Sequence, residues 1–218
     1  MTVYAVVQPA GGTGKSTLAA ELLVALADQG GERHRVVGID CDVSGTLLIR
    51  NGLLYDSDVY EAAPEVLTGR VSAADAATLS ASVPRARLVA FDPGLRGGGR
   101  FDTVLLVAAL REQLRRLQQV YDDVVIDIPP GTSWYTLAAA AVADVLITPV
   151  PGQVEAQLGL DRLRVAIHYE LTALLKPRPH RWWIVPVCFD HSRALGQEIL
   201  GRLRKWYPHW VTSPVRET

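Results

Sequence analysis

The amino-acid sequence predicts a doubly wound α/β fold, in which a mostly parallel β-sheet carries helices on both faces. Two observations lead to this prediction. Short runs of β-branched and apolar residues alternate with longer stretches of helical periodicity along nearly the whole chain. The first run passes through a glycine-rich turn into a helix, and a second run follows that helix. Strand, helix, strand is the simplest unit of a parallel sheet.

The first such unit occupies residues 3–40. Val3–Val7 is a β-branched and aromatic run that predicts a strand. Lys15–Gln29 has a leucine at every fourth position, which predicts a helix with one apolar stripe, and two glycines follow it. Val36–Ile39 is the second predicted strand and stops at Asp40. The leucines of the stripe are Leu18, Leu22 and Leu26.

The later segments continue the alternation less regularly. The run RGGGR, Arg96–Arg100, predicts a flexible loop. The predicted helices are Asp58–Thr68, Ser72–Leu79, Val104–Val120, Tyr135–Val142, Leu158–Leu175 and Ala194–Trp206. The predicted strands are Arg87–Phe91, the run VVIDI that two prolines end, Val145–Val150 and Trp183–Cys188, with a turn KPRPH at 176–180.

The composition is that of one globular domain spanning residues 1–218, with 49% apolar and 21% charged residues. A net charge of −1 means that binding to nucleic acid or acidic lipid would need a local patch. The isolated Cys41 and Cys188 predict no disulfide framework. No apolar run reaches the roughly 20 residues that cross a bilayer, and the first residues lack a signal-peptide pattern. We therefore expect a cytoplasmic protein.

The glycine-rich turn GGTGKST, residues 11–17, has the chemistry of a phosphate-binding loop. Binding a phosphate chain takes closely approaching backbone N–H groups, the positive end of a helix and a fixed cation. Gly11, Gly12 and Gly14 let the backbone curl around oxygen atoms. Lys15 can reach the β- and γ-phosphates, and Ser16 can bind Mg²⁺. The alternative, a plain glycine turn with a solvated lysine, does not explain why this turn joins a strand to a helix.

Three aspartates stand at or just after the ends of predicted strands. Asp127 ends the run VVID, where its carboxylate would face the Mg²⁺ shell. Asp40 and Asp42 follow the second strand, and their carboxylates point the same way if the strand continues through Asp42. Each could instead cap a following helix. Three such residues after a phosphate loop favour a nucleotide and metal site.

The segments GGTGKST, IDCDVSG, VVIDIPPG and LITPVPGQVEAQLGLDRL resemble, in this order, the ParA/MinD family of deviant Walker ATPases, a group of P-loop NTPases. The middle portion, DVYEAAPEVLTGRVSAADAA, and the late PVCFDHSRALGQEILGRLRKWYP resemble the ParA branch, so the likeness covers nearly the whole chain. The resemblance implies an ATPase that binds ATP and Mg²⁺, forms a homodimer around the nucleotide and binds DNA nonspecifically. It also implies slow hydrolysis, stimulated by a ParB-like or adaptor partner, that positions a plasmid, chromosome or protein organelle.

By the same resemblance, individual residues receive roles. Lys15 would hold the β- and γ-phosphates and Ser16 the metal, Asp42 would position the attacking water, and Asp127 would bind the metal through water. Asp42 is a second candidate for a water-mediated metal contact. The candidate catalytic residues are thus Lys15, Asp42 and Asp127. The further candidates for nucleotide binding or support are Gly11, Gly12, Thr13, Gly14, Thr17, Asp40 and, near the adenine, Pro214.

The chain departs from the family pattern at Ala10. The hallmark KGGxGK[ST] has a lysine there that reaches the phosphates bound by the partner subunit, and an alanine supplies no cation. Carboxysome-positioning relatives of ParA also lack this lysine. Either another basic residue replaces it, with Arg96, Arg100 and Arg193 as options, or dimerisation is weaker. Pro9, where a conventional loop has glycine, is compatible with the deviant form.

Two surfaces could attract partners. Arg202, Arg204 and Lys205 lie on the last predicted helix and are candidates for a DNA-binding patch, which would make the protein nucleoid-associated. Basic residues of the turn at 176–181 lie nearby in the sequence. The alternative is a solvated helix face. Membrane binding is not expected, because WVTSPVRET has no apolar stripe to insert.

Two other functions remain open on the same fold. One is a metabolic enzyme such as a dethiobiotin synthetase-like ligase, or a metal-cluster carrier, the latter disfavoured because no C-x-x-C pair is present. The other is a regulator that binds nucleotide without hydrolysing it. The tryptophans at 182, 183, 206 and 210 favour packing in the core or over a sheet edge rather than stacking on a ligand.

Overall fold

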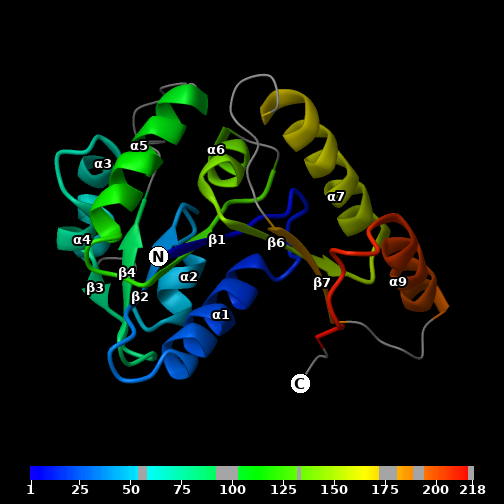
Figure 1. The fold of residues 1–218 in the computed structure, drawn as a ribbon, viewed down its shortest axis with the longest axis horizontal. Helices are drawn as coiled ribbons and strands as arrows, with labels where there is room; N and C mark the ends of the chain where they lie inside the picture. The colour runs from blue at the N-terminus through cyan, green and yellow to red at the C-terminus, as the bar shows by residue number, and fades with distance from the viewer. Residues whose placement is uncertain (54–57, 92–102, 132–133, 172–180, 189–193, 216–218) are drawn as a thin grey trace.

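The computed structural model describes residues 1–53, 58–91, 103–131, 134–171, 181–188 and 194–215. Its centre is a seven-stranded sheet with the strand order β3-β4-β2-β5-β1-β6-β7 (Figure 1). The strands are β1 (Thr2–Val6), β2 (Val36–Asp40), β3 (Thr78–Leu79), β4 (Ala86–Ala90), β5 (Asp123–Asp127), β6 (Val145–Pro151) and β7 (Arg181–Val187). All neighbouring strands run parallel except β3, which pairs antiparallel with β4. The predicted mostly parallel, doubly wound sheet is confirmed.

The strand order reverses at β1, in the middle of the sheet. From β1 the chain moves outward to β2 and β4, returns to β5, and then adds β6 and β7 on the other side. In open α/β sheets, ligands bind at the carboxyl ends of the strands where the order reverses. The loop after β1 occupies that position.

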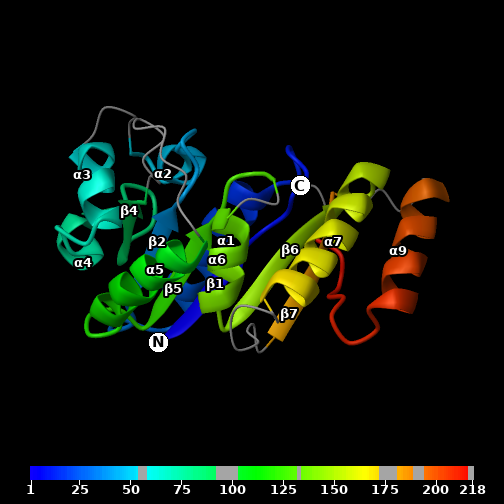
Figure 2. The same ribbon diagram turned by 90° about the horizontal axis from the view of Figure 1, so that it is seen from above.

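Helices cover both faces of the sheet, as predicted. α5, α6 and α7 lie on one face and α1 and α2 on the other, with α9 beside α7 at one end (Figures 1 and 2). Two clusters of buried apolar side chains, one on each face, form the core. The helices are α1 (Lys15–Gln29), α2 (Thr46–Arg50), α3 (Asp58–Leu67), α4 (Ala73–Ala76), α5 (Thr103–Leu117), α6 (Trp134–Val142), α7 (Val154–Ala166), which continues as a π-helical turn (Ile167–Leu171), and α9 (Ala194–Trp206).

Helix α1 has the predicted bounds but buries a different stripe. The fully buried residues are Ala19, Leu23 and Ala27, whereas the predicted leucines at 18, 22 and 26 lie one position earlier and are half-buried. Two alanines in the innermost row let the helix approach the sheet closely. Leucines flanking the row then widen the apolar contact.

The segment Ser72–Leu79 was predicted as one helix, and this prediction is wrong. The Ser72 hydroxyl accepts a hydrogen bond from the Ala74 N–H at 3.2 Å and starts a single turn of helix, α4, that ends at Ala76. Thr78 and Leu79 then pair with β4 as the strand β3. Pairing with a neighbouring strand, which sequence periodicity does not report, outweighs the helical pattern.

Other boundaries differ from the predictions by a few residues. Helix α7 begins at Val154, four residues before the predicted start, and α2 was not predicted at all. Strands β1, β4 and β7 are each displaced by one or two residues, while α9 has its predicted bounds. The predicted loop at 96–100 and the turn at 176–180 lie outside the described residues. No helix in the described ranges has the length and hydropathy to cross a bilayer.

The segment after α9 returns along the outer side of β7. The Ile184 N–H donates to the Trp210 carbonyl at 2.7 Å, and the Val215 N–H donates to the Pro186 carbonyl at 2.8 Å. Trp182 stacks on Trp210 with ring centroids 5.3 Å apart. These two tryptophans pack at the edge of the sheet as predicted, whereas Trp183 and Trp206, for which the same packing was expected, have exposed side chains.

Candidate functional site

The predicted phosphate loop connects the carboxyl end of β1 to the start of α1. Gly12 and Gly14 have φ values of +67° and +84°, a conformation that favours glycine, so the glycine requirement is met at these two positions. Gly14 is the N-cap residue of α1 and, as a glycine, has no side chain with which to cap the helix. As far as the described residues go, the first N–H groups of α1 are left open to an anion, as at an anion-binding helix N-terminus.

Lys15 lies in the first turn of α1 and is folded into the site. Its side chain is 7% exposed, and its ammonium donates to the carbonyl oxygen of Ala10 at 3.3 Å. The Thr13 hydroxyl donates to the same carbonyl at 3.2 Å. Burial lowers the pKa of Lys15, while the negative charges of Asp127 and Asp42 raise it. The cation is thus placed between the loop backbone and two carboxylates.

Asp127 ends β5 and pairs in register with Val6 of β1 on one side and Asp40 of β2 on the other. Its side chain is 0% exposed. Burial raises its pKa to about 6, although the Ser16 hydroxyl and the Lys15 charge lower it. Despite the approach of Ser16, neither carboxylate oxygen has a partner with full hydrogen-bond geometry among the described residues. A buried carboxylate without partners is suited to a cation or its water shell.

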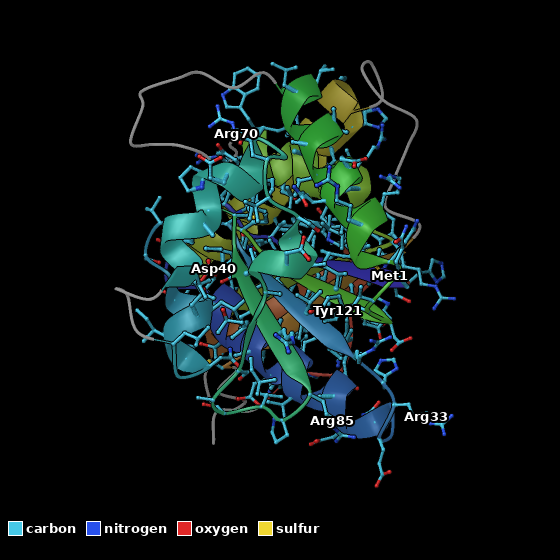
Figure 3. All side chains as sticks on the ribbon, turned by 90° about the vertical axis from the view of Figure 1, so that its left-hand side faces the viewer. Met1, Arg33, Asp40, Arg70, Arg85 and Tyr121 are labelled. Carbon is cyan, nitrogen blue, oxygen red and sulfur yellow. The ribbon has the colours of Figure 1, made fainter. Side chains whose placement is uncertain are left out.

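Asp40 is a structural anchor rather than an open ligand. Its carboxylate accepts hydrogen bonds from the N–H groups of Asp42, Leu47 and Leu48 at 2.9, 3.0 and 3.2 Å. Burial and the nearby Asp127 raise its pKa to about 7. The helix-capping interpretation, which the sequence left open, is therefore correct for Asp40. Figure 3 shows it inside the molecule, at the opposite end of β2 from Arg33.

Asp42 lies in a turn, because β2 ends at Asp40 instead of continuing through Asp42. The expected strand alternation therefore does not orient its carboxylate. Instead, the Asp42 carboxylate accepts from the Ser44 N–H at 2.9 Å and its carbonyl accepts from the Gly45 N–H at 2.9 Å. Asp42 is half-buried and close enough to Lys15 and Asp127 to act on the pKa of each.

Gln8, which the sequence analysis did not single out, lies directly before the loop. It is buried, and its amide contacts the backbone of β6 and α7. The feature of the sequence that could have identified Gln8 is its position as a polar residue between the apolar Val6 and Val7 and the glycine-rich loop. On the other side of the loop, the Gly131 N–H donates to the Pro9 carbonyl at 2.9 Å. The loop is thus tied to both halves of the sheet.

The remaining candidates lie farther from this group. Pro214 is half-buried beside the carboxyl end of β7, at the same edge of the sheet as the phosphate loop but two strands away from β1. On α9, Arg202 forms an ion pair with Glu198, whereas Arg204 and Lys205 are exposed. The candidates Arg96, Arg100 and Arg193 lie outside the described residues.

No three His, Cys, Asp or Glu side chains of the described ranges gather closely enough to hold a metal by themselves. Mg²⁺ commonly binds through one or two carboxylates together with waters and phosphates, so this finding fits a metal that arrives with a nucleotide. Two surface hollows of about 480 and 410 Å³ lie at the amino ends of the strands, and Met1 and Asp144 line both. They are remote from the phosphate loop.

Sequence comparisons identify relatives over most of the chain. A family model described as an AAA domain matches residues 1–173. The chain is 32% identical over 208 residues to the chromosome-partitioning ATPase Soj of Thermus thermophilus, which covers 94% of this chain and 77% of the relative. It is 28% identical over 227 residues to the chromosome partitioning protein ParA of Caulobacter vibrioides, covering 99% of this chain and 80% of the relative.

Solved structures resemble the whole chain. The crystal structure of cobyrinic acid a,c-diamide synthase from Mycobacterium smegmatis with bound ADP and magnesium has a TM-score of 0.83 and 25% identity, covering 100% of this chain and 88% of that chain. Cyanothece McdA in complex with ATP has a TM-score of 0.81 at 20% identity, covering 100% and 84%, and shows the fold alone. From the family model and the identity to Soj, the chain belongs to the ParA/MinD family of P-loop ATPases.

Proposed function

We propose that this protein is a ParA-like positioning ATPase. It binds ATP with Mg²⁺, forms a homodimer, binds DNA nonspecifically and is released when a ParB-like or adaptor protein stimulates hydrolysis. The observation that supports this most strongly is the meeting of three features at the carboxyl ends of strands β1 and β5: a helix N-terminus whose N-cap is glycine, the buried cation of Lys15, and the buried carboxylate of Asp127, which has no hydrogen-bond partner among the described residues. Two relatives are named as chromosome-partitioning proteins, which supports a chromosome or a similar body as the class of cargo.

The residues present fit ATP and Mg²⁺. The backbone of Gly11, Gly12, Thr13 and Gly14 would surround the phosphates with N–H groups, and Lys15 would exchange the Ala10 carbonyl for the β- and γ-phosphates. Ser16 would contribute its hydroxyl to the metal, and Asp127 and Asp42 would contact it through water. Bound Mg²⁺ would neutralise phosphate charge during transfer.

Hydrolysis requires a water in line with the γ-phosphate and little acid–base chemistry. Asp42 is the candidate that positions this water, since it is half-buried and near Lys15. Asp40 supports it by holding the Asp42 N–H and the first turn of α2. Thr17 and Pro214 remain weaker candidates for contacts to the nucleotide. Slow turnover fits a protein in which hydrolysis serves as a timing signal.

Ala10 decides how two subunits would share the nucleotide. Its side chain supplies no charge, so the homodimer would lack the cation that the signature lysine provides across the interface. We expect ATP binding within one subunit to be intact and association of subunits to be weaker than in lysine-bearing relatives. Equilibrium sedimentation with a nonhydrolysable ATP analogue, for the wild type and Ala10→Lys, measures this difference.

Nonspecific DNA binding would use the exposed cations of α9. The Glu198 carboxylate offsets the charge of Arg202, so Arg204 and Lys205 are the stronger candidates for phosphate contacts. Each phosphate contact adds about one unit to the slope of log K against log salt concentration. Such a complex would place the protein in the cytoplasm, on the nucleoid.

The test measures binding to a nonspecific DNA duplex with ADP, ATP and a nonhydrolysable analogue, for wild type, Lys15→Ala and Asp42→Ala. We expect binding that depends on ATP, weakens with salt, disappears in Lys15→Ala and persists in Asp42→Ala with little hydrolysis. Glu198→Gln should strengthen DNA binding by freeing Arg202, while Arg204→Gln should weaken it. Equal DNA binding with and without nucleotide contradicts the proposal.

A second candidate is a metabolic ligase, which the likeness to a diamide synthase favours. A ligase would consume ATP only with its carboxylate substrate, and DNA would leave its ATPase rate unchanged. ATP-dependent DNA binding in the assay above, and an ATPase rate that DNA changes, would therefore separate the positioning ATPase from a ligase. ATP binding without turnover in every combination of DNA and partner would instead indicate a regulator.

A further inference from the structure

Gln8 joins the phosphate loop to two other elements through one side chain. It is 1% exposed, and its amide nitrogen donates to the carbonyl oxygens of Pro149 in β6 at 3.0 Å and Ala156 in α7 at 3.2 Å. Its amide oxygen accepts from the N–H of Ala10 at 3.5 Å, the long limit for a hydrogen bond. Both donor hydrogens of the amide are used, and the oxygen faces the loop.

Gly159 of α7 makes this arrangement possible. A Cβ atom at this position would lie 2.4 Å from the Gln8 amide oxygen and 3.3 Å from the Ala10 nitrogen. The φ of Gly159 is not positive, so the helix does not need a glycine there for its backbone conformation. The absence of a side chain instead lets the first half of α7 lie directly against Gln8 and the loop.

We propose that Gln8 is a positioning residue for the phosphate loop, and that Gly159 is required to keep the Gln8 amide in place. Gln8 sets where Ala10 and the following N–H groups stand relative to the end of β6 and the start of α7. Because those N–H groups must converge on the phosphates, their placement before binding determines nucleotide affinity. This inference rests on the ATP binding in the proposed function but not on DNA binding, dimerisation or cargo.

The chain offers a matched control in Gln113 on α5. It is also 1% exposed and also binds three main-chain groups, accepting from the Ala73 N–H at 2.8 Å and donating to the carbonyls of Val66 and Val71 at 2.7 and 3.2 Å. Gln113 holds the turn between α3 and α4, in a different part of the sheet. Its loss should lower stability as much as the loss of Gln8 does, without touching the loop.

The experiment compares wild type, Gln8→Ala and Gln113→Ala by two measurements. The first is hydrogen exchange of a peptide covering residues 8–15 in nucleotide-free protein. The second is the dissociation constant for a nonhydrolysable ATP analogue with Mg²⁺. We expect faster exchange and about fivefold weaker binding in Gln8→Ala, since the lost hydrogen bond to the loop corresponds to about 1 kcal/mol. Gln113→Ala should match wild type in both measurements, although its Tm should fall as far as that of Gln8→Ala.

Gly159→Ala provides a second, independent variant. In the wild-type background its methyl group displaces the Gln8 amide oxygen, so we expect a loss of ATP affinity similar to that of Gln8→Ala. In the Gln8→Ala background the 2.4 Å clash is gone and only the 3.3 Å contact with the Ala10 nitrogen remains, so the added methyl group should cause a much smaller further loss. Additive effects in this double-mutant cycle would mean that the two residues act separately, which contradicts the proposal.

The two hypotheses fail in different ways. If wild type does not bind ATP, the proposed function is wrong, and the hydrogen-exchange comparison still decides whether Gln8 holds the loop. Unchanged exchange in Gln8→Ala, or ATP affinity equal to wild type, overturns the positioning role. Equal losses in Gln8→Ala and Gln113→Ala overturn it too, because a general loss of stability would then explain both.

Discussion

Asp127→Asn tests the electrostatics of the site, because it removes a buried charge while keeping nearly the same shape. Burial raises the pKa of Asp127 from 3.8 to about 6, so the folded protein holds this proton more tightly than the unfolded chain does. The protonated side chain causes no penalty below about pH 4. As the pH rises from about 4 the unfolded chain loses this proton first, so the free energy of unfolding falls until the folded protein also loses the proton near pH 6. A difference of about two pKa units corresponds to about 3 kcal/mol once ionisation is complete.

Asparagine removes this pH-dependent penalty but adds a constant one. Its amide would also lack hydrogen-bond partners, at a cost of about 1–2 kcal/mol at every pH. We therefore expect the variant to exceed wild type in free energy of unfolding by about 1–2 kcal/mol near pH 8 and to fall below it near pH 4.5. The change in this difference between the two pH values, about 2 kcal/mol, does not depend on the amide cost.

Urea unfolding of nucleotide-free protein, followed by tryptophan fluorescence at both pH values, measures the difference. Asp28→Asn, which removes a carboxylate at an exposed position of α1 away from the site, is the control. The reasoning is refuted if Asp127→Asn gains no stability over wild type between pH 4.5 and pH 8. In the proposed function the same variant should lose Mg²⁺-dependent ATP hydrolysis, so a gain in stability would accompany a loss of activity.

Four further outcomes follow from the structure. In Gly38→Ala, the new Cβ would lie 2.7 Å from a Leu88 methyl carbon and 2.8 Å from one of Leu23, so urea unfolding should show a loss of about 1–3 kcal/mol. Gly201→Ala in α9, where the added Cβ meets no described atom within 4 Å, should be neutral or stabilising by up to about 1 kcal/mol. A larger loss of stability in Gly201→Ala than in Gly38→Ala would contradict this reasoning. Trp182→Phe removes the indole N–H that donates to the buried Thr148 hydroxyl at 2.9 Å, so it should lower the free energy of unfolding by about 1–3 kcal/mol. An unchanged Tm in this variant would contradict a stabilising role of this hydrogen bond. The pKa of Asp40 is also raised, to about 7, so wild-type stability should fall further between about pH 4 and pH 7, and a flat pH profile would exclude this.

The strand ends and the phosphate loop could be predicted because their signals are local. A β-branched run, a glycine turn and a leucine period identify β1, the loop and α1 from a few consecutive residues. Asp127 could be placed at the carboxyl end of β5 for the same reason. In a parallel sheet these ends lie along one edge, so consecutive motifs are brought together without any knowledge of loop structure.

Contacts between distant segments could not be predicted. The strand β3 exists because Thr78 and Leu79 meet β4, and the capping role of Asp40 depends on Leu47, seven residues later in the first turn of α2. Gln8 is a polar residue in an apolar context, yet the two carbonyl groups that its amide nitrogen binds lie more than 140 residues away. Such polar contacts leave no period in the sequence, so they appear only once the chain is folded.

Both borders of the sheet are built so that they offer little backbone to another chain. At one border β3 contributes two residues, and at the other the segment after α9 covers β7 through bridges at Ile184–Val211 and Val187–Val215. A long bare strand would invite a second molecule to pair with it, and short or covered strands prevent such pairing. Two copies of this chain would therefore have to meet through helices and loops, where association can respond to a bound nucleotide, which continuous backbone pairing could not do.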